Sequence, residues 1–137
     1  MYIVINGGGK IGEFLAAELL EQGNAVAVIE KNPKKAERLS LLLEKAVLVI
    51  NGDGCDSTVQ AEAGVDNADV FVATTGADDV NLVSAEIATI IHSAKRCIAR
   101  VNNPKNERIF NKIGVKAVSS TTVIARIIEN DFAHQSE

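Results

Sequence analysis

Short apolar runs alternate with stretches of helical periodicity along the whole chain. The apolar runs span 2–5, 25–29, 46–50, 69–73, 97–101 and 116–118, and near-continuous apolar runs of this length are typical of strands buried in a parallel sheet. Helices are predicted at about 10–22, 57–63, 78–94, 104–113 and 121–133. Strands that alternate with helices predict an α/β fold, with a doubly wound parallel sheet covered on both faces.

The turn after the first apolar run is rich in glycine. Gly7, Gly9 and Gly12 have the spacing G-x-G-x-x-G between a predicted strand and a predicted helix. Gly7 allows the tight turn, Gly9 lets phosphates approach the main chain, and Gly12 lets the helix pack on the strand. Gly8 adds backbone freedom that the motif does not require. The turn favours a dinucleotide-binding site over the alternative, an ordinary flexible loop. Right-handed crossovers and the switch point then give a Rossmann-type six-stranded sheet of order 3-2-1-4-5-6.

The second apolar run ends in an acidic residue, Glu30, at the distance from Gly12 where a carboxylate accepts the ribose hydroxyls of a dinucleotide. A carboxylate there repels a 2′-phosphate, so NAD or another plain adenosine ligand is favoured over NADP. Lys31 and Lys34 weaken that preference, because a neighbouring cation tolerates an extra phosphate. The alternative role for Glu30 is that of a solvated strand end.

In a doubly wound sheet the ligand lies outside the carboxyl ends of the strands. Besides the glycine turn and Glu30, the candidates at those ends are Gly52, Asp53, Thr74, Thr75, Gly76 and Arg100. Asp53 accepts from the adenosine end or closes an Asx turn. The two threonines hydrogen-bond the phosphates or the second ribose, or else cap the next helix. Arg100 binds an anion or a carboxylate, or forms a surface salt bridge.

Two predicted helices carry more apolar residues than one sheet face needs. Between residues 80 and 91 the only charged residue is Glu86. A helix that is apolar nearly all round is buried on more than one side, so we expect a subunit contact there. The last helix has an apolar stripe that either completes the chain's own core or packs on a partner, formed by Val123, Ile124, Ile127, Ile128 and Phe132.

Composition narrows the function classes. The chain has 137 residues, of which 47 % are hydrophobic and 23 % charged, as in one globular domain. Its net charge of −4 and the lack of a basic run argue against nucleic-acid binding. The apolar runs are too short for a membrane span or a signal peptide, so we expect a cytoplasmic protein without direct membrane insertion.

The cysteines and histidines suggest no catalytic or metal site. Cys55 and Cys97 lack the spacing of metal ligands. Cys97 begins an apolar run and is expected in the core, whereas Cys55 is expected in a loop. His92 and His134 have no obvious partners and are expected at the surface.

Taken in order, these motifs resemble the regulator-of-potassium-conductance family, also called KTN or TrkA-N. The resemblance covers essentially the whole chain and rests on the segments 7–12, 28–30, 51–53, 68–76, 79–82, 99–101 and 113–115. It implies an adenine nucleotide held by Gly7, Gly9, Gly12, Glu30, Gly52, Asp53, Thr74, Thr75 and Arg100. Lys10 matches a position close to the phosphates where the family often has arginine. Gly8, Ile11 and Lys31 complete the candidate contacts.

The resemblance also implies a function. We expect a non-catalytic cytosolic regulatory subunit or domain that binds NAD or NADH, with ATP or ADP as the alternative. It would form a homodimer, which can assemble into a larger ring, and gate a membrane potassium transporter or channel at the inner face of the cell membrane. Two departures stand out. Ser119, Ser120 and Thr121 occur where the family often has Ser-Pro, and no second regulatory lobe is expected after the last helix, so the domain spans 1–137.

Two other functions remain open. One is a small NAD-dependent oxidoreductase, which needs an acid or base positioned beside the nicotinamide. The chain has a single tyrosine, Tyr2, in the first predicted strand, and neither histidine follows a strand directly. The other is a nucleotide-sensing domain of a different membrane transporter, which the sequence does not separate from the potassium assignment.

Overall fold

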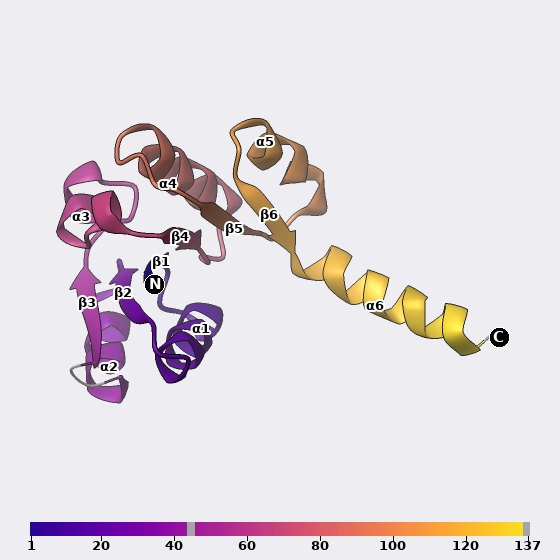
Figure 1. Cartoon of the computed structure of the whole chain (residues 1–137), viewed down its shortest axis with the longest axis horizontal. Helices are drawn as coiled ribbons and strands as arrows, with labels where there is room; N and C mark the ends of the chain where they lie inside the picture. Colours follow the sequence, from indigo (N-terminus) through magenta and orange to yellow (C-terminus); the bar gives the residue numbers. More distant parts are fainter. Residues whose placement is uncertain (44–45, 136–137) are drawn as a thin grey trace.

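The computed structural model describes residues 1–43 and 46–135. In chain order the elements are β1 (Tyr2–Asn6), α1 (Lys10–Glu21), β2 (Ala25–Glu30), α2 (Pro33–Leu42), β3 (Val47–Asn51), α3 (Ser57–Glu62), η2 (Val65–Asn67), β4 (Val70–Ala73), α4 (Asp78–Ile90), β5 (Cys97–Val101), η3 (Pro104–Asn106), α5 (Glu107–Lys112), β6 (Lys116–Ser119) and α6 (Ser120–Gln135). The strands form one six-stranded sheet of order β3-β2-β1-β4-β5-β6, paired in parallel throughout (Figure 1). The predicted fold class and strand order are confirmed.

Side chains of the central strands alternate between two apolar cores. In β1, Val4 shares one core with residues of α4 and α5, whereas Ile3 and Ile5 share the other with residues of α1 and α2. These three side chains are at most 2 % exposed. With helices on both faces, the carboxyl ends of the strands are left at one edge of the sheet, where a ligand is expected.

Helix boundaries differ from the predicted ones in two places. The helix expected over 78–94 ends at Ile90, and Ser93 then turns the chain with φ +53. The helix expected over 104–113 divides into the 3₁₀ turn η3 and α5. One helix, α2, has no counterpart in the prediction. The Asn32 side chain caps it by accepting from two N–H groups of its first turn.

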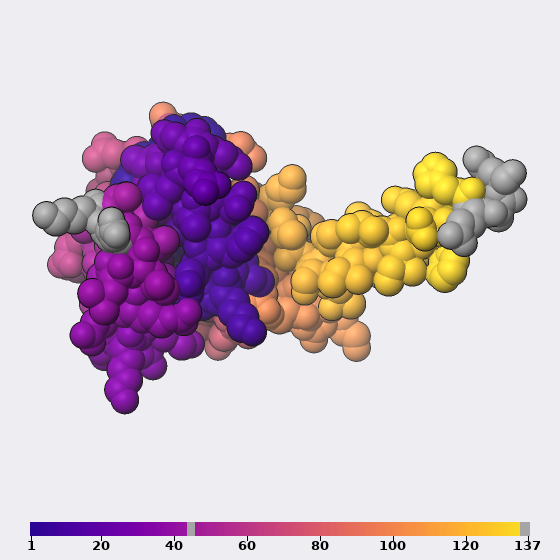
Figure 2. All heavy atoms as spheres, turned by 90° about the horizontal axis from the view of Figure 1, so that it is seen from below, coloured from indigo at the N-terminus to yellow at the C-terminus, as the bar shows by residue number. Residues whose placement is uncertain are grey.

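α6 leaves the domain instead of completing its core. It starts at β6 and projects as an arm from the rest of the molecule (Figure 1, Figure 2). Its apolar stripe is exposed, from 44 % at Val123 to 69 % at Phe132. Of the two alternatives for this stripe, the structure therefore excludes packing in the chain's own core, and packing on a partner stays a prediction.

α4 is buried on one side only within this chain. Small and polar residues face the core, whereas Val83, Ile90 and Ile91 are 44, 73 and 58 % exposed. The predicted burial of a second side therefore needs another molecule and stays a prediction. Within the described residues, no helix combines the length and the apolar character needed to span a bilayer.

The expectation that His92 is a surface group is wrong. It is 7 % exposed, with Nδ1 2.8 Å from Asp66 Oδ1 and Nε2 3.2 Å from Ser57 Oγ. It thereby joins the end of α4 to α3 and η2. Cys97 is buried and His134 is exposed, as predicted.

Candidate functional site

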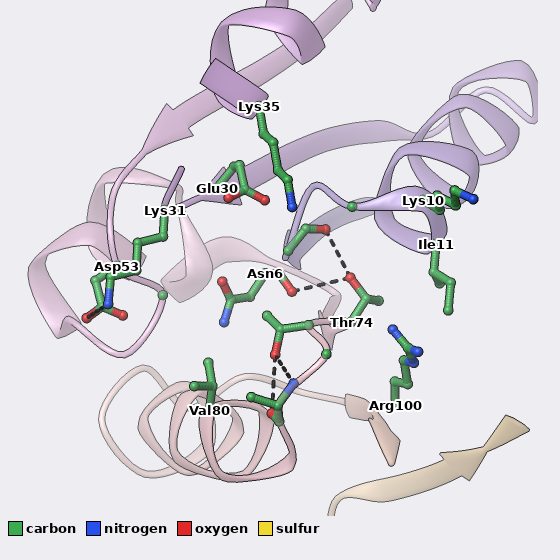
Figure 3. A pocket seen from close by; sticks show the side chains of 16 residues that line it. Asn6, Lys10, Ile11, Glu30, Lys31, Lys35, Asp53, Thr74, Val80 and Arg100 are labelled. Atoms are coloured by element: carbon green, nitrogen blue, oxygen red, sulfur yellow. Dashed lines mark hydrogen bonds and ion pairs between the residues drawn. The ribbon is translucent and has the colours of Figure 1, made fainter. Parts of the chain in front are cut away.

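A cavity of about 650 Å³ opens at the carboxyl edge of the sheet, where the turns after β1, β2, β3 and β4 meet (Figure 3). This volume is typical of small-molecule and cofactor sites, which span about 300–1,000 Å³. The predicted residues that line it are Gly7, Gly9, Lys10, Ile11, Glu30, Lys31, Asp53, Thr74, Thr75, Gly76 and Arg100. Three further predicted residues, Gly8, Gly12 and Gly52, lie outside the lining.

The glycine turn leaves the start of α1 bare. Gly7 has φ +116, in the region that favours glycine. A Cβ on Gly12 would lie 1.8 Å from Gly7 O, so a side chain there would push α1 off the turn. A Cβ on Gly9 would meet nothing within 4 Å, and α1 has no side-chain cap there. Unpaired N–H groups at a bare helix start are suited to a phosphate.

Glu30 joins the glycine turn to α2. Its Oε1 accepts from Gly8 N over 2.8 Å and its Oε2 from Asn32 N over 2.7 Å. It is 9 % exposed, so it is not a solvated strand end. Gly8 packs closely against α2, because a Cβ there would lie 2.2 Å from Leu39 Cδ1 and would displace that side chain. A carboxylate has about four lone-pair sites, so two remain for a ligand in the cavity.

Asp53 lines the cavity on the side away from Lys10 and Arg100 (Figure 3). Its Oδ1 accepts from Cys55 N over 2.9 Å, which is the predicted Asx turn, and its Oδ2 lies 3.8 Å from Lys31 Nζ. The carboxylate also lines the cavity, so the two roles are compatible. Gly52 supports this turn by donating its N–H to Glu30 O over 3.1 Å. Burial, and then the charge of Asp53, raise the pKa of the Cys55 thiol, which keeps it protonated at neutral pH.

Asn81 in α4 holds the threonine turn, although it was not predicted as a site residue. It is fully buried. Its Oδ1 accepts from Thr75 N over 3.0 Å, and its Nδ2 donates to Thr75 O over 3.0 Å and to Arg100 O over 2.8 Å. Thr74 Oγ1 donates to Gly7 O over 3.0 Å. These bonds fix the ends of β4 and β5 against the glycine turn.

Asp78, at the start of α4, fixes the loop after β5. Its carboxylate accepts from the main-chain N–H groups of Asn102 and Asn103 over 2.6 and 2.9 Å, and from Asn106 Nδ2 over 2.8 Å. Burial by itself raises the pKa of this carboxyl, but the hydrogen bonds outweigh it and hold the pKa at about 2. Asp78 is therefore charged at neutral pH.

Positive side chains outnumber negative ones in the lining, which includes Lys10, Lys31, Lys35 and Arg100 against Glu30 and Asp53. Figure 3 shows Lys10 and Arg100 on the side of the cavity away from Asp53. Lys35, and not Lys34, is the α2 cation of the lining. Among the described residues Arg100 has no ion pair, and its buried Nε has no hydrogen-bond partner. Such a charge balance favours an anionic ligand.

Comparison with known proteins places this chain in a family. A model of the TrkA-N domain matches residues 3–121. The chain belongs to the TrkA-N family. A curated relative, the Trk system potassium uptake protein TrkA homolog of Methanothermobacter thermautotrophicus, is 42 % identical over 120 residues, which cover 88 % of this chain and 54 % of the relative. The chain thus spans about half the length of the curated relatives it matches.

Solved structures have the same TrkA-N fold. The TrkA-N domain of the inner membrane protein ybaL from Escherichia coli has a TM-score of 0.84 and 20 % identity, with 94 % of each chain covered. The GsuK channel bound to NAD has a TM-score of 0.74 and 22 % identity, covering 85 % of this chain and 21 % of that one. The Kef CTD of Shewanella denitrificans in AMP-bound form has a TM-score of 0.79 and 21 % identity, covering 91 % and 75 %.

Besides Lys35, four residues of this TrkA-N domain line the cavity without having been predicted: Asn6, Gly54, Ala77 and Val80. Asn6 had a usable signal, since it is a polar residue at the carboxyl end of an apolar strand. Val80 had no such signal, because an apolar residue at that position of a predicted helix is equally typical of the core.

Proposed function

We propose that this TrkA-N domain binds an adenine nucleotide in the cavity, with NAD or NADH as the first candidate and ATP or ADP as the alternative. The proposal rests on the bare start of α1 beside the buried Glu30 carboxylate, in one cavity of about 650 Å³. The NAD of the GsuK structure and the AMP of the Kef structure share an adenosine monophosphate part, which supports the adenine nucleotide class.

The proposed pose follows from the chemistry of the walls. The phosphates lie on the N–H groups at Gly9 and Lys10. The ribose hydroxyls donate to the free lone pairs of Glu30, which also disfavours the 2′-phosphate of NADP. The base then extends toward Asp53, and Arg100 is left for a further phosphate or another anionic group.

The domain is further proposed to be a non-catalytic regulator of a membrane potassium transporter or channel, as the name of its Methanothermobacter relative suggests. In this proposal it is cytoplasmic and reaches the inner face of the membrane through that partner. The exposed apolar residues of α4 and α6 support a homodimer and its assembly into a ring. A nucleotide alters such an assembly only if it binds two arrangements with different affinities.

Titration calorimetry of the purified chain with NAD, NADH, ATP and ADP tests the nucleotide proposal. We expect micromolar or tighter binding of at least one of them. Glu30→Gln weakens that binding about tenfold, since it removes a charged acceptor of the ribose hydroxyls. Glu62→Gln, the same exchange on the exposed side of α3, leaves it unchanged. If none of the four ligands binds, the proposal is wrong.

The other functions have their own tests. The described cavity lining contains no histidine, tyrosine or cysteine, and we assign its lysines and carboxylates to nucleotide binding instead of to oxidoreductase chemistry. Sustained oxidation of NADH with a keto acid would reverse that judgement. A nucleotide-sensing domain of a different membrane protein is a second candidate, favoured by the likeness to ybaL. Crosslinking in native membranes followed by mass spectrometry distinguishes it from a potassium transporter subunit.

A further inference from the structure

One buried polar group in the cavity wall lacks a partner. Asn6, the last residue of β1, is 4 % exposed, and its Nδ2 is buried without a hydrogen-bond partner. Its main chain is fixed at the carboxyl end of the sheet, where Asn6 O accepts from Thr74 N over 2.9 Å. An unpaired buried donor costs stability, so a purely structural role would favour an apolar residue here. The carboxamide instead lines the cavity.

The Asn6 side chain lies on the face of the sheet opposite α1. Val4 packs on the α4 side of the sheet, and alternation along β1 places Asn6 on the same side. Gly54 lies against the carboxamide, because a Cβ on Gly54 would be 2.1 Å from Asn6 Oδ1. Figure 3 shows the carboxamide pointing toward the side of the cavity that carries Asp53 and Val80.

We propose that the Asn6 carboxamide hydrogen-bonds the edge of the bound nucleobase and, together with Asp53, makes the site selective for adenine. The inference rests on the proposed nucleotide binding. With phosphates at α1 and ribose at Glu30, the base reaches the side of the cavity that carries Asp53. Adenine presents an amino donor beside a ring-nitrogen acceptor. A carboxamide matches this edge with two parallel hydrogen bonds.

Asp53 decides which purine fits that edge. The two ends of a carboxamide exchange donor and acceptor when the group rotates, so Asn6 alone accommodates either kind of edge. The ionised Asp53 carboxylate only accepts hydrogen bonds, and it therefore favours a base with an amino group on that side. A 6-oxopurine presents a carbonyl oxygen in the same place and faces repulsion. Together the two side chains select adenine over hypoxanthine and guanine.

Calorimetric titration with ADP and inosine diphosphate tests the inference. ADP carries the adenosine and phosphates that NAD, NADH and ATP share, and inosine diphosphate has a carbonyl in place of the amino group. We expect the unmodified chain to bind ADP about tenfold or more tightly than inosine diphosphate. In Asn6→Leu the affinities for ADP and for inosine diphosphate both fall about tenfold, whereas in Asp53→Asn the preference for ADP shrinks, because a carboxamide there also donates. Asn111→Leu, the same exchange as Asn6→Leu at an exposed position of α5, changes neither affinity.

A second measurement separates base recognition from a structural role. Asn6→Leu removes an unpaired buried donor, so the melting temperature of the nucleotide-free protein stays unchanged or rises. The increase in melting temperature on adding ADP becomes smaller, because the nucleotide binds less tightly. Asn6→Ala covers the case in which leucine does not fit beside Gly54, and it shows the same loss of affinity.

The outcomes separate the inference from the function on which it rests. If the unmodified chain binds ADP and inosine diphosphate equally, or if the folded Asn6 variants keep full ADP affinity, base recognition by Asn6 is wrong and nucleotide binding stands. If the unmodified chain binds no nucleotide at all, the proposed function is wrong as well.

Discussion

The turns after β1 and after β4 lie side by side at the cavity but are held in different ways. The first has no side chain of its own from Gly7 to Gly9, and its form depends on Gly7 and Gly12, where a Cβ would meet neighbouring atoms. The side chains of Glu30 and Thr74 bond its main chain from outside. The second is held by the side chains of Asn81 and Asp78, which bond the loops on either side. We therefore expect substitutions that add side-chain atoms to destabilise the first turn, and substitutions that remove side-chain atoms to destabilise the second.

Gly12→Ala disturbs the first turn and has the largest expected effect. The new Cβ lies 1.8 Å from Gly7 O, so α1 must move away from the turn. We expect the free energy of unfolding, measured by urea denaturation, to fall by about 3 kcal/mol or more. Gly76→Ala is the control in the second turn, since its Cβ meets nothing within 4 Å, and it costs about 0.5 kcal/mol or less. Equal costs for the two variants would contradict the comparison.

Asn81→Ala disturbs the second turn by removing atoms. The Thr75 N–H and the Arg100 carbonyl lose the Asn81 partner that binds them now. The Thr75 carbonyl keeps only the longer hydrogen bond from Asn102 Nδ2, over 3.4 Å. Since these groups are partly buried, we expect a loss of about 2–3 kcal/mol in urea denaturation. Asn111→Ala on exposed α5 is the matched control, and a loss no larger than in that control would mean that side chains do not hold this turn.

Asp78→Asn tests the same turn through its pH dependence. The pKa of Asp78 lies at about 2 in the folded chain, below its ordinary value of 3.8. Because the folded-state pKa is the lower one, its stabilisation is present above about pH 4 and is lost as the pH falls toward 2. Solvent screening limits the effect to about 1–2 kcal/mol.

Urea denaturation at several pH values is therefore used to compare the stability of the unmodified chain with that of Asp78→Asn. The unmodified chain is more stable than Asp78→Asn at neutral pH, and most of the difference is lost as the pH falls to about 2. A difference that stays constant over this range would show that the charge of Asp78 does not stabilise the loop.

The difference between the two turns also explains what could be predicted from the sequence. The strands and the glycine turn follow from local signals, since apolar period and glycine spacing each lie within one strand–turn–helix unit. The strand order follows once right-handed crossovers are applied to those units. The threonines of the second turn were predicted because they follow a strand. Asn81 was missed because its role depends on Thr75 and Arg100, which come together only when β4 and β5 pair.

Other features depended on helix rotation or on distant partners. Lys35 lines the cavity and Lys34 does not, because one residue corresponds to about 100° around a helix. His92 is buried by Asp66 and Ser57, which are 26 and 35 residues away in the sequence. The stripe of α6 predicted an apolar face correctly, but periodicity does not tell which molecule covers such a face.

Gly9→Ala has the smallest expected effect on stability and tests the first turn most directly as a binding site. The φ of Gly9 is −73°, which alanine adopts readily, and the new Cβ meets nothing within 4 Å. Because glycine is the better N-cap residue, we expect the free energy of unfolding to fall slightly, by about 1 kcal/mol or less. The methyl group would nevertheless occupy the space above the start of α1 where a phosphate is proposed to lie. Calorimetry should therefore show about tenfold weaker ADP binding, and unchanged affinity would mean that no phosphate rests on this turn, even if a nucleotide binds elsewhere in the cavity.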